Sequence, residues 1–170
     1  KWNTQKIARL AFLVALALIL HSVEGMIPSS LPVPGAKLGL ANIVTLMAVI
    51  MMGTGDALLV VTLRTLLASL LLGRLSGFAF SIVGGVLATF AMSFAYGRQK
   101  PALGLTGVSI LGAIVHNIGQ LIVARIILGT PAVFSYLPVL LLTGVATGFF
   151  VGLTTGYLLH YLLLPGNSLT

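Results

Sequence analysis

Apolar residues run through this sequence in six long stretches, separated by short connectors. The stretches cover residues 7–23, 38–52, 57–72, 78–96, 108–128 and 137–164. A helix that crosses a membrane needs about 17–25 predominantly apolar residues, and the six stretches approach or reach that length. The connectors are rich in Gly, Pro and Ser, which favour turns, and none is long enough to fold alone. The pattern predicts an all-α integral membrane protein, with a compact six-helix transmembrane bundle forming one domain over residues 1–170.

The composition explains why these stretches belong in lipid rather than in a soluble core. Hydrophobic residues make up 58% of the chain and charged residues only 6%, with a mean hydropathy of +1.16. An ordinary soluble domain is about 25% charged, so this chain cannot cover its surface with polar groups. There is no cysteine, which excludes disulfides and cysteine chemistry. The net charge of +7 comes without a basic run interleaved with aromatic residues, so we expect no nucleic-acid partner.

The positions of the basic residues predict how the chain is oriented. With the N-terminus inside, the cytoplasmic side holds Lys1, Lys6, Arg9, Arg98 and Lys100. The outer side then holds Lys37 and Arg74. Because cytoplasmic loops carry the excess of Lys and Arg, this predicts a multi-pass protein of the inner or plasma membrane with both termini cytoplasmic. The inverted orientation is the alternative.

Two stripes of small residues predict close contacts between helices. In the last stretch a glycine recurs at every fourth position, at Gly144, Gly148, Gly152 and Gly156. Such residues let two backbones approach, so we expect helix packing here. In the first stretch, small residues share one helical face at Ala8, Ala11 and Ala15. For this second stripe, packing inside the bundle and docking of a partner protein both remain open.

Ionisable and polar residues inside the stretches are candidates for a binding site. Arg64 lies roughly 12 Å from either end of its stretch, at about 1.5 Å per residue, and charges at such depth usually face the bundle interior. Arg125 is nearer the end of its stretch, where snorkelling to lipid headgroups is the alternative. His116, Asn117 and Gln120 share a face, which predicts either ligand binding or hydrogen bonds between helices.

A count of charges in the outer half favours a ligand. The predicted cations there are Lys37, Arg64, Arg74 and Arg125. Glu24 is the one acid predicted on that side. Because a buried charge needs a partner, the excess of cations predicts an anionic ligand in a pocket that opens outward.

The segment PGAKLGLANIV, residues 34–44, places a lysine directly before an apolar helix. A lysine is unfavourable at the positive end of a helix dipole, but an anion bound there would reverse that effect. Lys37, the free backbone N–H groups and Asn42 would then all attract the same anion. The alternative is a pair between Lys37 and Glu24 that fixes the connector.

Catalysis is not expected from this set of residues. The whole chain has two acidic residues, too few for a carboxylate-rich Mg²⁺ site. It has no Walker nucleotide-binding loop, and its three histidines lie on three different stretches. We therefore expect no catalytic residue, no cofactor and no metal site.

These features resemble a known family. Six short helices in about 170 residues, with a small-residue stripe on the first, are similar to the substrate-binding S components of energy-coupling factor (ECF) transporters. The segment PGAKLGLANIVTL resembles more closely the hallmark of the bacterial Gx transporter family, also catalogued as heptaprenyl diphosphate synthase component I. The resemblance covers nearly the whole chain.

The resemblance implies a function and a set of partners. In an S component the ligand enters from outside, the connector at 26–37 would cover it, and the Ala11–Ala15 surface would dock on a transmembrane coupling subunit. Separate ATPase subunits would drive transport. Ligands implied are vitamin-like or flavin-like anions and quinone or isoprenoid precursors. From their position in the outer connector, we expect Phe134 and Tyr136 either to close over an aromatic or apolar body or to anchor at the membrane interface. The alternative is a non-catalytic membrane subunit of a heptaprenyl diphosphate synthase or redox assembly, since the aspartate-rich motifs of such synthases are absent.

Overall fold

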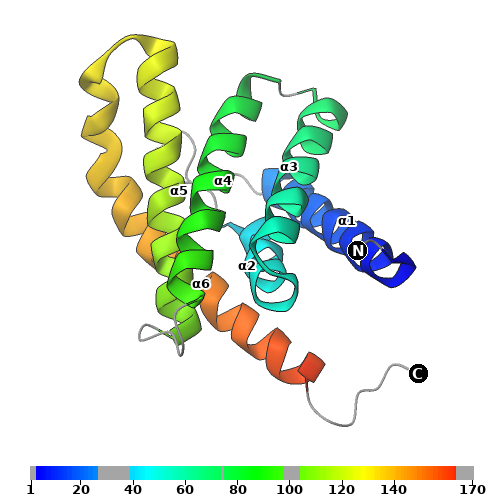
Figure 1. The fold of residues 1–170 in the computed structure, drawn as a ribbon. Coiled ribbons are helices and arrows are strands. Elements are labelled where there is room, and N and C mark those ends of the chain that lie inside the picture. Colours follow the sequence, from blue (N-terminus) through cyan, green and yellow to red (C-terminus); the bar gives the residue numbers. More distant parts are fainter. Residues whose placement is uncertain (1–2, 27–38, 74, 98–103, 164–170) are drawn as a thin grey trace.

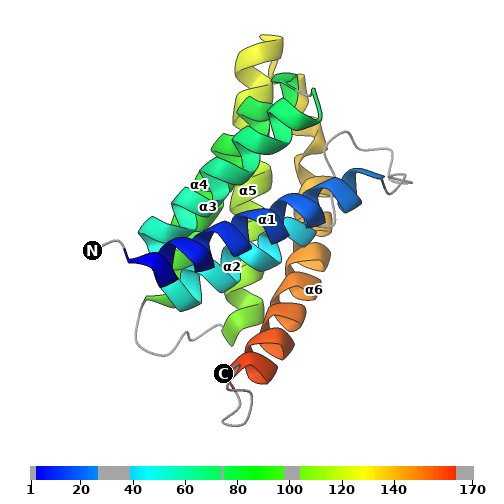
Figure 2. The ribbon, with the colours of Figure 1, turned by 90° about the vertical axis from the view of Figure 1, so that its right-hand side faces the viewer.

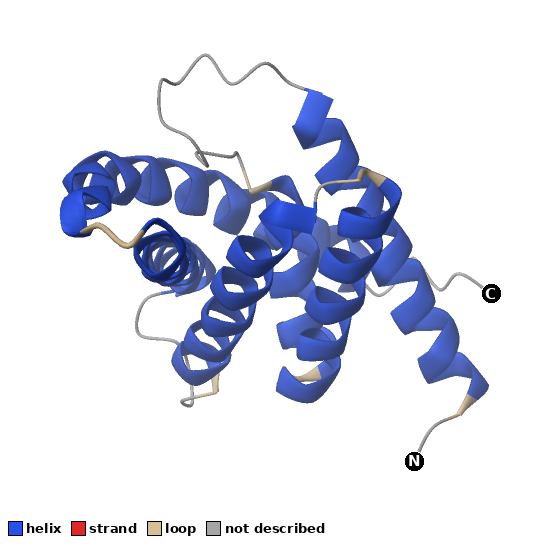
Figure 3. Cartoon of the chain, turned by 90° about the horizontal axis from the view of Figure 1, so that it is seen from above, coloured by secondary structure: helices blue, strands red, loops and turns tan. Residues whose placement is uncertain are grey.

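The computed structural model describes residues 3–26, 39–73, 75–97 and 104–163. These residues form six α-helices and one short 3-10 helix, without a strand (Figures 1 and 3). The elements are α1 Thr4–Met26, α2 Leu40–Met52, α3 Thr54–Leu71, α4 Leu75–Tyr96, α5 Gly104–Leu128, η1 Pro131–Tyr136 and α6 Leu137–Leu163. The predicted all-α bundle of six helices is confirmed.

Most of the helices are long enough to cross a membrane. Among the described residues, five helical segments meet the length and hydropathy of a span: α1, α3, α4, α5 and the continuous η1–α6 segment. Helix α2 has 13 residues, which at about 1.5 Å per residue is shorter than the roughly 30 Å hydrocarbon core. The chain is therefore a multi-pass membrane protein, in which the second predicted stretch is too short to cross by itself.

Helix α2 instead lies in the middle of the bundle. It contacts α1, α3, α4 and α6, and Figure 1 shows it between the α1–α3 side and the α5–α6 side. Its residues from Ile43 to Val49 are all buried, and Val44, Leu46 and Ala48 are fully so. A helix that is apolar on nearly all sides is a buried one, which agrees with the central position of α2.

Helix α6 packs closely on α5 through the glycine stripe. A Cβ atom added to Gly148 would lie 2.6 Å from the Cα of Ile110, and one added to Gly152 would lie 2.5 Å from the Cα of Thr106. Both distances are too short for real atoms, so only glycine permits this approach. A Cβ at Gly144 would lie 3.0 Å from the Asn117 amide, whereas Gly156 has room, with its nearest atom at 3.9 Å.

Helix α1 crosses α2 and α3, as Figure 2 shows. Its inner face, which includes Leu10, Leu13 and Ala17, packs into a core cluster with residues of α2 and α3. The small-residue stripe lies on the opposite, exposed face, at Ala8, Ala11 and Ala15. The stripe is therefore not used for packing among the described helices.

Candidate functional site

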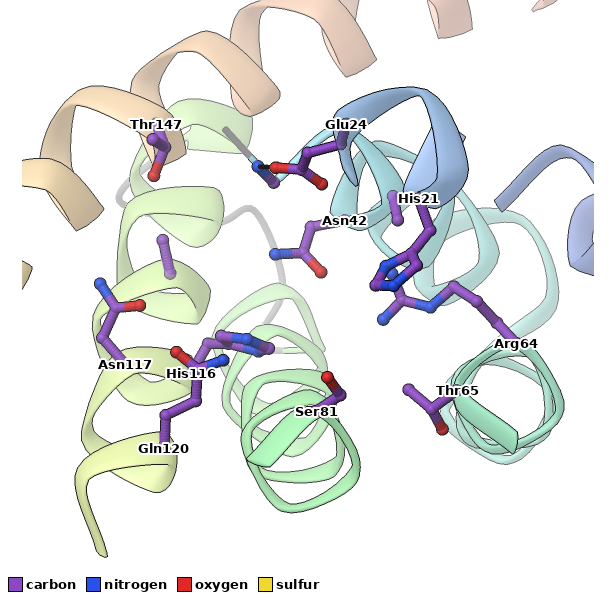
Figure 4. Close-up of a pocket in the computed structure, with 13 residues that line it drawn as sticks. His21, Glu24, Asn42, Arg64, Thr65, Ser81, His116, Asn117, Gln120 and Thr147 are labelled. Atoms are coloured by element: carbon purple, nitrogen blue, oxygen red, sulfur yellow. Dashed lines mark hydrogen bonds between the residues drawn. The ribbon is translucent and has the colours of Figure 1, made fainter. Parts of the chain in front are cut away.

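A polar cavity lies among the six helices. Its lining residues come from every α-helix: His21 and Glu24 (α1), Gly39 before α2, Ala41 and Asn42 (α2), Arg64 and Thr65 (α3), Ser81 (α4), Ala113, His116, Asn117 and Gln120 (α5) and Thr147 (α6) (Figure 4). The cavity measures about 50 Å³. One water needs roughly 10–15 Å³ on this measure, so there is space for a few waters, a small molecule or the head group of a larger one.

Arg64 is the charged centre of the cavity on the α3 side. The residue is 4% exposed, and its side chain extends toward the middle of the cavity (Figure 4). Among the described residues, its Nε has no hydrogen-bond partner. A Cβ added to Gly85 of α4 would lie 3.8 Å from Arg64 Nη2 and 2.8 Å from Val61, so the guanidinium reaches the cavity beside a close α3–α4 contact. An arginine this deep in a bundle is costly to keep there, which makes Arg64 a candidate for ligand binding.

Glu24 is the acidic counterpart of Arg64. It is 7% exposed, and its negative charge acts favourably on the Arg64 guanidinium. Its Oε1 accepts a hydrogen bond from the backbone N–H of Gly39, the residue that precedes α2. A carboxylate at a helix N-terminus is stabilised by the free N–H groups and the helix dipole. The chain therefore supplies an anion of its own at the start of α2.

Gly39 has the backbone conformation that brings Glu24 and α2 together. Its φ of 75° and ψ of 27° are left-handed, a region that glycine adopts without steric cost. Its carbonyl accepts the first hydrogen bond of α2, from Asn42 N at 2.8 Å. The position of Glu24 changes the interpretation of PGAKLGLANIV: the predicted anion site at this helix end already holds a protein carboxylate. Lys37, and with it the predicted Lys37–Glu24 pair, lies outside the described residues.

The polar face of α5 forms the opposite wall. His116, Asn117 and Gln120 all line the cavity, as expected of residues that share a helical face. Asn117 also connects two helices, because its Nδ2 donates a hydrogen bond of 2.7 Å to the Leu140 carbonyl on α6. The His116 ring lies against α4, where a Cβ at Gly84 would come within 3.1 Å of it. Asn117 therefore serves helix packing as well as lining the cavity.

Several other predicted site residues are not part of this lining. Arg125 lies in the last turn of α5, partly exposed, where its side chain is placed for snorkelling. Phe134 and Tyr136 lie on η1 and are 41% and 48% exposed. Arg74 falls outside the described residues. Of the predicted ligand-binding residues, the structure brings together Asn42, Arg64, His116, Asn117 and Gln120.

Some lining residues were not predicted as site residues. His21 and Glu24 are three positions apart on α1, so they share a face, and this spacing in an otherwise apolar helix was a usable signal. Ser81 and Thr147 gave no such signal, because single hydroxyls are common in membrane helices. Although two histidines and a glutamate share the cavity, no three acidic or histidine side chains of the described residues are placed to hold a metal ion.

The comparison with known families bears directly on this arrangement. The chain matches the profile of the family described as heptaprenyl diphosphate synthase component I over residues 13–158. It belongs to this family. The match confirms the resemblance to the Gx transporter family that the PGAKLGLANIVTL segment indicated. The matched range in this family member runs from α1 into α6 and includes every residue that lines the cavity. No curated protein and no solved structure matches the chain.

Proposed function

We propose that this protein is the substrate-binding membrane subunit of an ECF-like transporter, which takes up a small anionic or amphipathic molecule from the outer face. The observation that carries the proposal is the cavity around Arg64. In a chain with so few charged residues, a buried arginine, a buried glutamate and a wall of amides and hydroxyls converge at one place. Buried polar groups of this kind are costly in a membrane and typically mark a ligand site.

The size of the cavity limits which part of a ligand it can hold. At about 50 Å³ it accepts a small molecule or a head group, rather than a whole flavin or prenyl chain. For vitamin-, flavin-, quinone- or isoprenoid-precursor-like ligands, we place the charged head at Arg64. The apolar or aromatic body then requires a wider opening between the helices.

The outer surface of α1 is the proposed contact with the rest of the transporter. Ala8, Ala11 and Ala15 are exposed there, and small residues allow another helix to approach closely. In this proposal the surface docks on a transmembrane coupling subunit, while separate ATPase subunits bind the nucleotide. Both termini then lie in the cytoplasm and the protein resides in the inner or plasma membrane.

A second candidate function follows from the family description. Heptaprenyl diphosphate synthase component I names a subunit of a prenyl-transferring enzyme. The two acids of this chain are too few for the metal-binding motifs of that chemistry, and Asp56 is already paired with Lys6 at 2.8 Å. The alternative is therefore a non-catalytic membrane subunit that delivers a lipid substrate to a soluble synthase.

Ligand retention tests the first proposal. The full chain is purified in mild detergent and the small molecules released on denaturation are identified by mass spectrometry. We expect one bound species in the wild type, its loss in Arg64→Ala, and its retention in the control Arg9→Ala, which removes an exposed cation outside the cavity. Thermal unfolding shows whether Arg64→Ala still folds.

Two other results would count against the transporter. Recovery of phospholipid alone from the wild type contradicts uptake of a small molecule. Co-purification with a soluble prenyl synthase, instead of a coupling subunit and ATPases, favours the second candidate.

A further inference from the structure

Both signs of charge occur in the part of the cavity lining that the structure describes. Within the described lining, Arg64 is the one cation other than histidine and Glu24 the one carboxylate, and they are 4% and 7% exposed. They come from different helices, α3 and α1, so the arrangement depends on the fold. The excess of predicted outer cations over Glu24 favoured an anion at this site, whereas the described lining contains one charge of each sign.

A purely anionic ligand is poorly matched to this arrangement. Its negative charge is attracted by Arg64 but repelled by Glu24. Two like charges 4 Å apart repel each other by about 4 kcal/mol at an effective dielectric constant of about 20. Repulsion of this size is enough to offset an equally close attraction. A purely cationic ligand meets the converse problem at Arg64. Arg64 and Glu24 both make favourable charge interactions only when one ligand carries an acidic and a basic group.

The two side chains also have the hydrogen-bonding capacity for such a ligand. A guanidinium carries five N–H donors in a planar fork that suits a carboxylate or phosphate, and Arg64 Nε makes no hydrogen bond to any described residue. A carboxylate accepts several donors at once, so the hydrogen bond from Gly39 to Glu24 is compatible with a further one from an ammonium group.

We infer that the cavity binds a zwitterion, with its acidic group on Arg64 and its ammonium group on Glu24. The inference rests on the proposed function, because it assigns the ligand class of the same cavity. Asn42 lies between the Glu24 and Arg64 side chains in Figure 4, Gln120 lines the α5 wall, and both amides can orient the ligand. The volume of about 50 Å³ fits an amino-acid-sized molecule. The same chemistry occurs in the head group of an ethanolamine phospholipid.

The test compares small probes that differ in their charged groups and in the distance between those groups. The full chain is reconstituted in nanodiscs of phosphatidylglycerol, a lipid whose head group has no ammonium group. Binding of glycine, β-alanine and γ-aminobutyrate is measured by calorimetry beside butyrate, butylamine and butanol. We expect at least one of the zwitterions, whose charge separation matches the cavity, to bind at least tenfold more tightly than butyrate or butylamine.

Two variants assign the charges to residues. Glu24→Gln keeps an oxygen that can accept the Gly39 hydrogen bond but removes the charge, so butyrate should then bind as tightly as the best zwitterion. Arg64→Gln should lose every acid-bearing probe. Asp56→Asn, which removes the other carboxylate of the chain outside this cavity, should leave the preference unchanged.

The possible results separate the two proposals. If butyrate binds the wild type as tightly as the zwitterions, and does so through Arg64, the zwitterion inference fails and the binding function stands. An unchanged preference in Glu24→Gln also overturns the inference. If no probe shows Arg64-dependent binding, the zwitterion inference fails, and ligand retention in Arg64→Ala decides the transporter proposal separately.

Adding phosphatidylethanolamine to the nanodiscs identifies the source of the zwitterion. If this lipid displaces the best zwitterion from the wild type but not from Glu24→Gln, the charge pattern is upheld with a lipid head group as ligand. That result contradicts import of a small molecule. If the lipid does not compete, the ligand is a free zwitterion.

Discussion

The two acidic residues of this chain make contacts at opposite ends of α1. Asp56 of α3 contacts the first turn of α1, and Glu24 near the last turn of α1 contacts the start of α2. Asp56 lies in the first turn of α3 and pairs with Lys6, from the first turn of α1, at 2.8 Å. Glu24, near the end of α1, meets Gly39 at the start of α2 and acts on Arg64. The Lys6 and Asp56 side chains are 33% and 16% exposed, whereas Glu24 and Arg64 are 7% and 4% exposed as whole residues.

The difference in burial gives the two acids different energetics. A partly exposed ion pair stabilises a fold by about 0–1 kcal/mol, because water screens both charges. Burying an ion costs several kcal/mol, which its partner only partly offsets. Replacing both charges by apolar residues of similar size is often neutral or stabilising, so stability by itself does not account for Glu24 and Arg64. We therefore attribute the buried charges to ligand binding and the Lys6–Asp56 pair to holding α1 against α3.

The largest effect is expected from Glu24→Ala. It removes the negative charge that acts favourably on the buried Arg64 and leaves the Gly39 N–H without its acceptor. Leaving a buried hydrogen-bonding group without its partner costs about 1–3 kcal/mol, and more where a charge is involved, so the apparent melting temperature in detergent should fall strongly. The melting temperature of Glu24→Gln should fall less, because the glutamine oxygen can still accept the hydrogen bond from the Gly39 N–H. An effect of Glu24→Ala no larger than that of Asp56→Ala would contradict the distinction between the two acids.

Replacing the glycines that precede α2 and α3 should have an intermediate effect on stability. Gly39 has φ 75° and Gly53 has φ 87° with ψ 176°, and both are conformations that alanine adopts only under strain. The expected cost is about 1–2 kcal/mol for Gly39→Ala and about 1–3 kcal/mol for Gly53→Ala, measured by thermal unfolding.

Ligand binding should distinguish these two variants. A Cβ at Gly39 would lie 3.3 Å from the Asn42 amide, inside the cavity, whereas a Cβ at Gly53 meets no described atom within 4 Å. Gly39→Ala should therefore weaken retention of the bound molecule and Gly53→Ala should not. Equal loss of ligand in both variants would show that strain, rather than cavity shape, controls binding.

The sequence predicts the helices well because lipid imposes a simple rule on them. An apolar run in lipid must form a helix to satisfy its backbone hydrogen bonds. The predicted stretches 78–96 and 108–128 accordingly end at the same residues as the helices Leu75–Tyr96 and Gly104–Leu128. The predicted starts are three or four residues late. The helices begin in polar or glycine-containing turns that hydropathy does not recognise.

The site is predictable only in part, for a different physical reason. Arg64 and the polar face of α5 are visible as polar residues in apolar helices, and the structure places them around one cavity. The contact of Glu24 with Gly39 joins residues fifteen positions apart across a connector, and no helical periodicity encodes it. The charge balance of the cavity, and thus the zwitterion inference, depends on that tertiary contact.

The smallest effect is expected where the exposed pair is broken. Lys6→Met and Asp56→Asn should each lower stability by no more than about 1 kcal/mol, and their double-mutant cycle should give a coupling energy within that range that decreases with added salt. Unfolding at low and high ionic strength measures both, and ligand retention should stay at the wild-type level. A salt-independent coupling of several kcal/mol, or loss of the ligand, would mean that this end of α1 acts on the cavity as well. The difference in burial would then no longer separate the two acids by role.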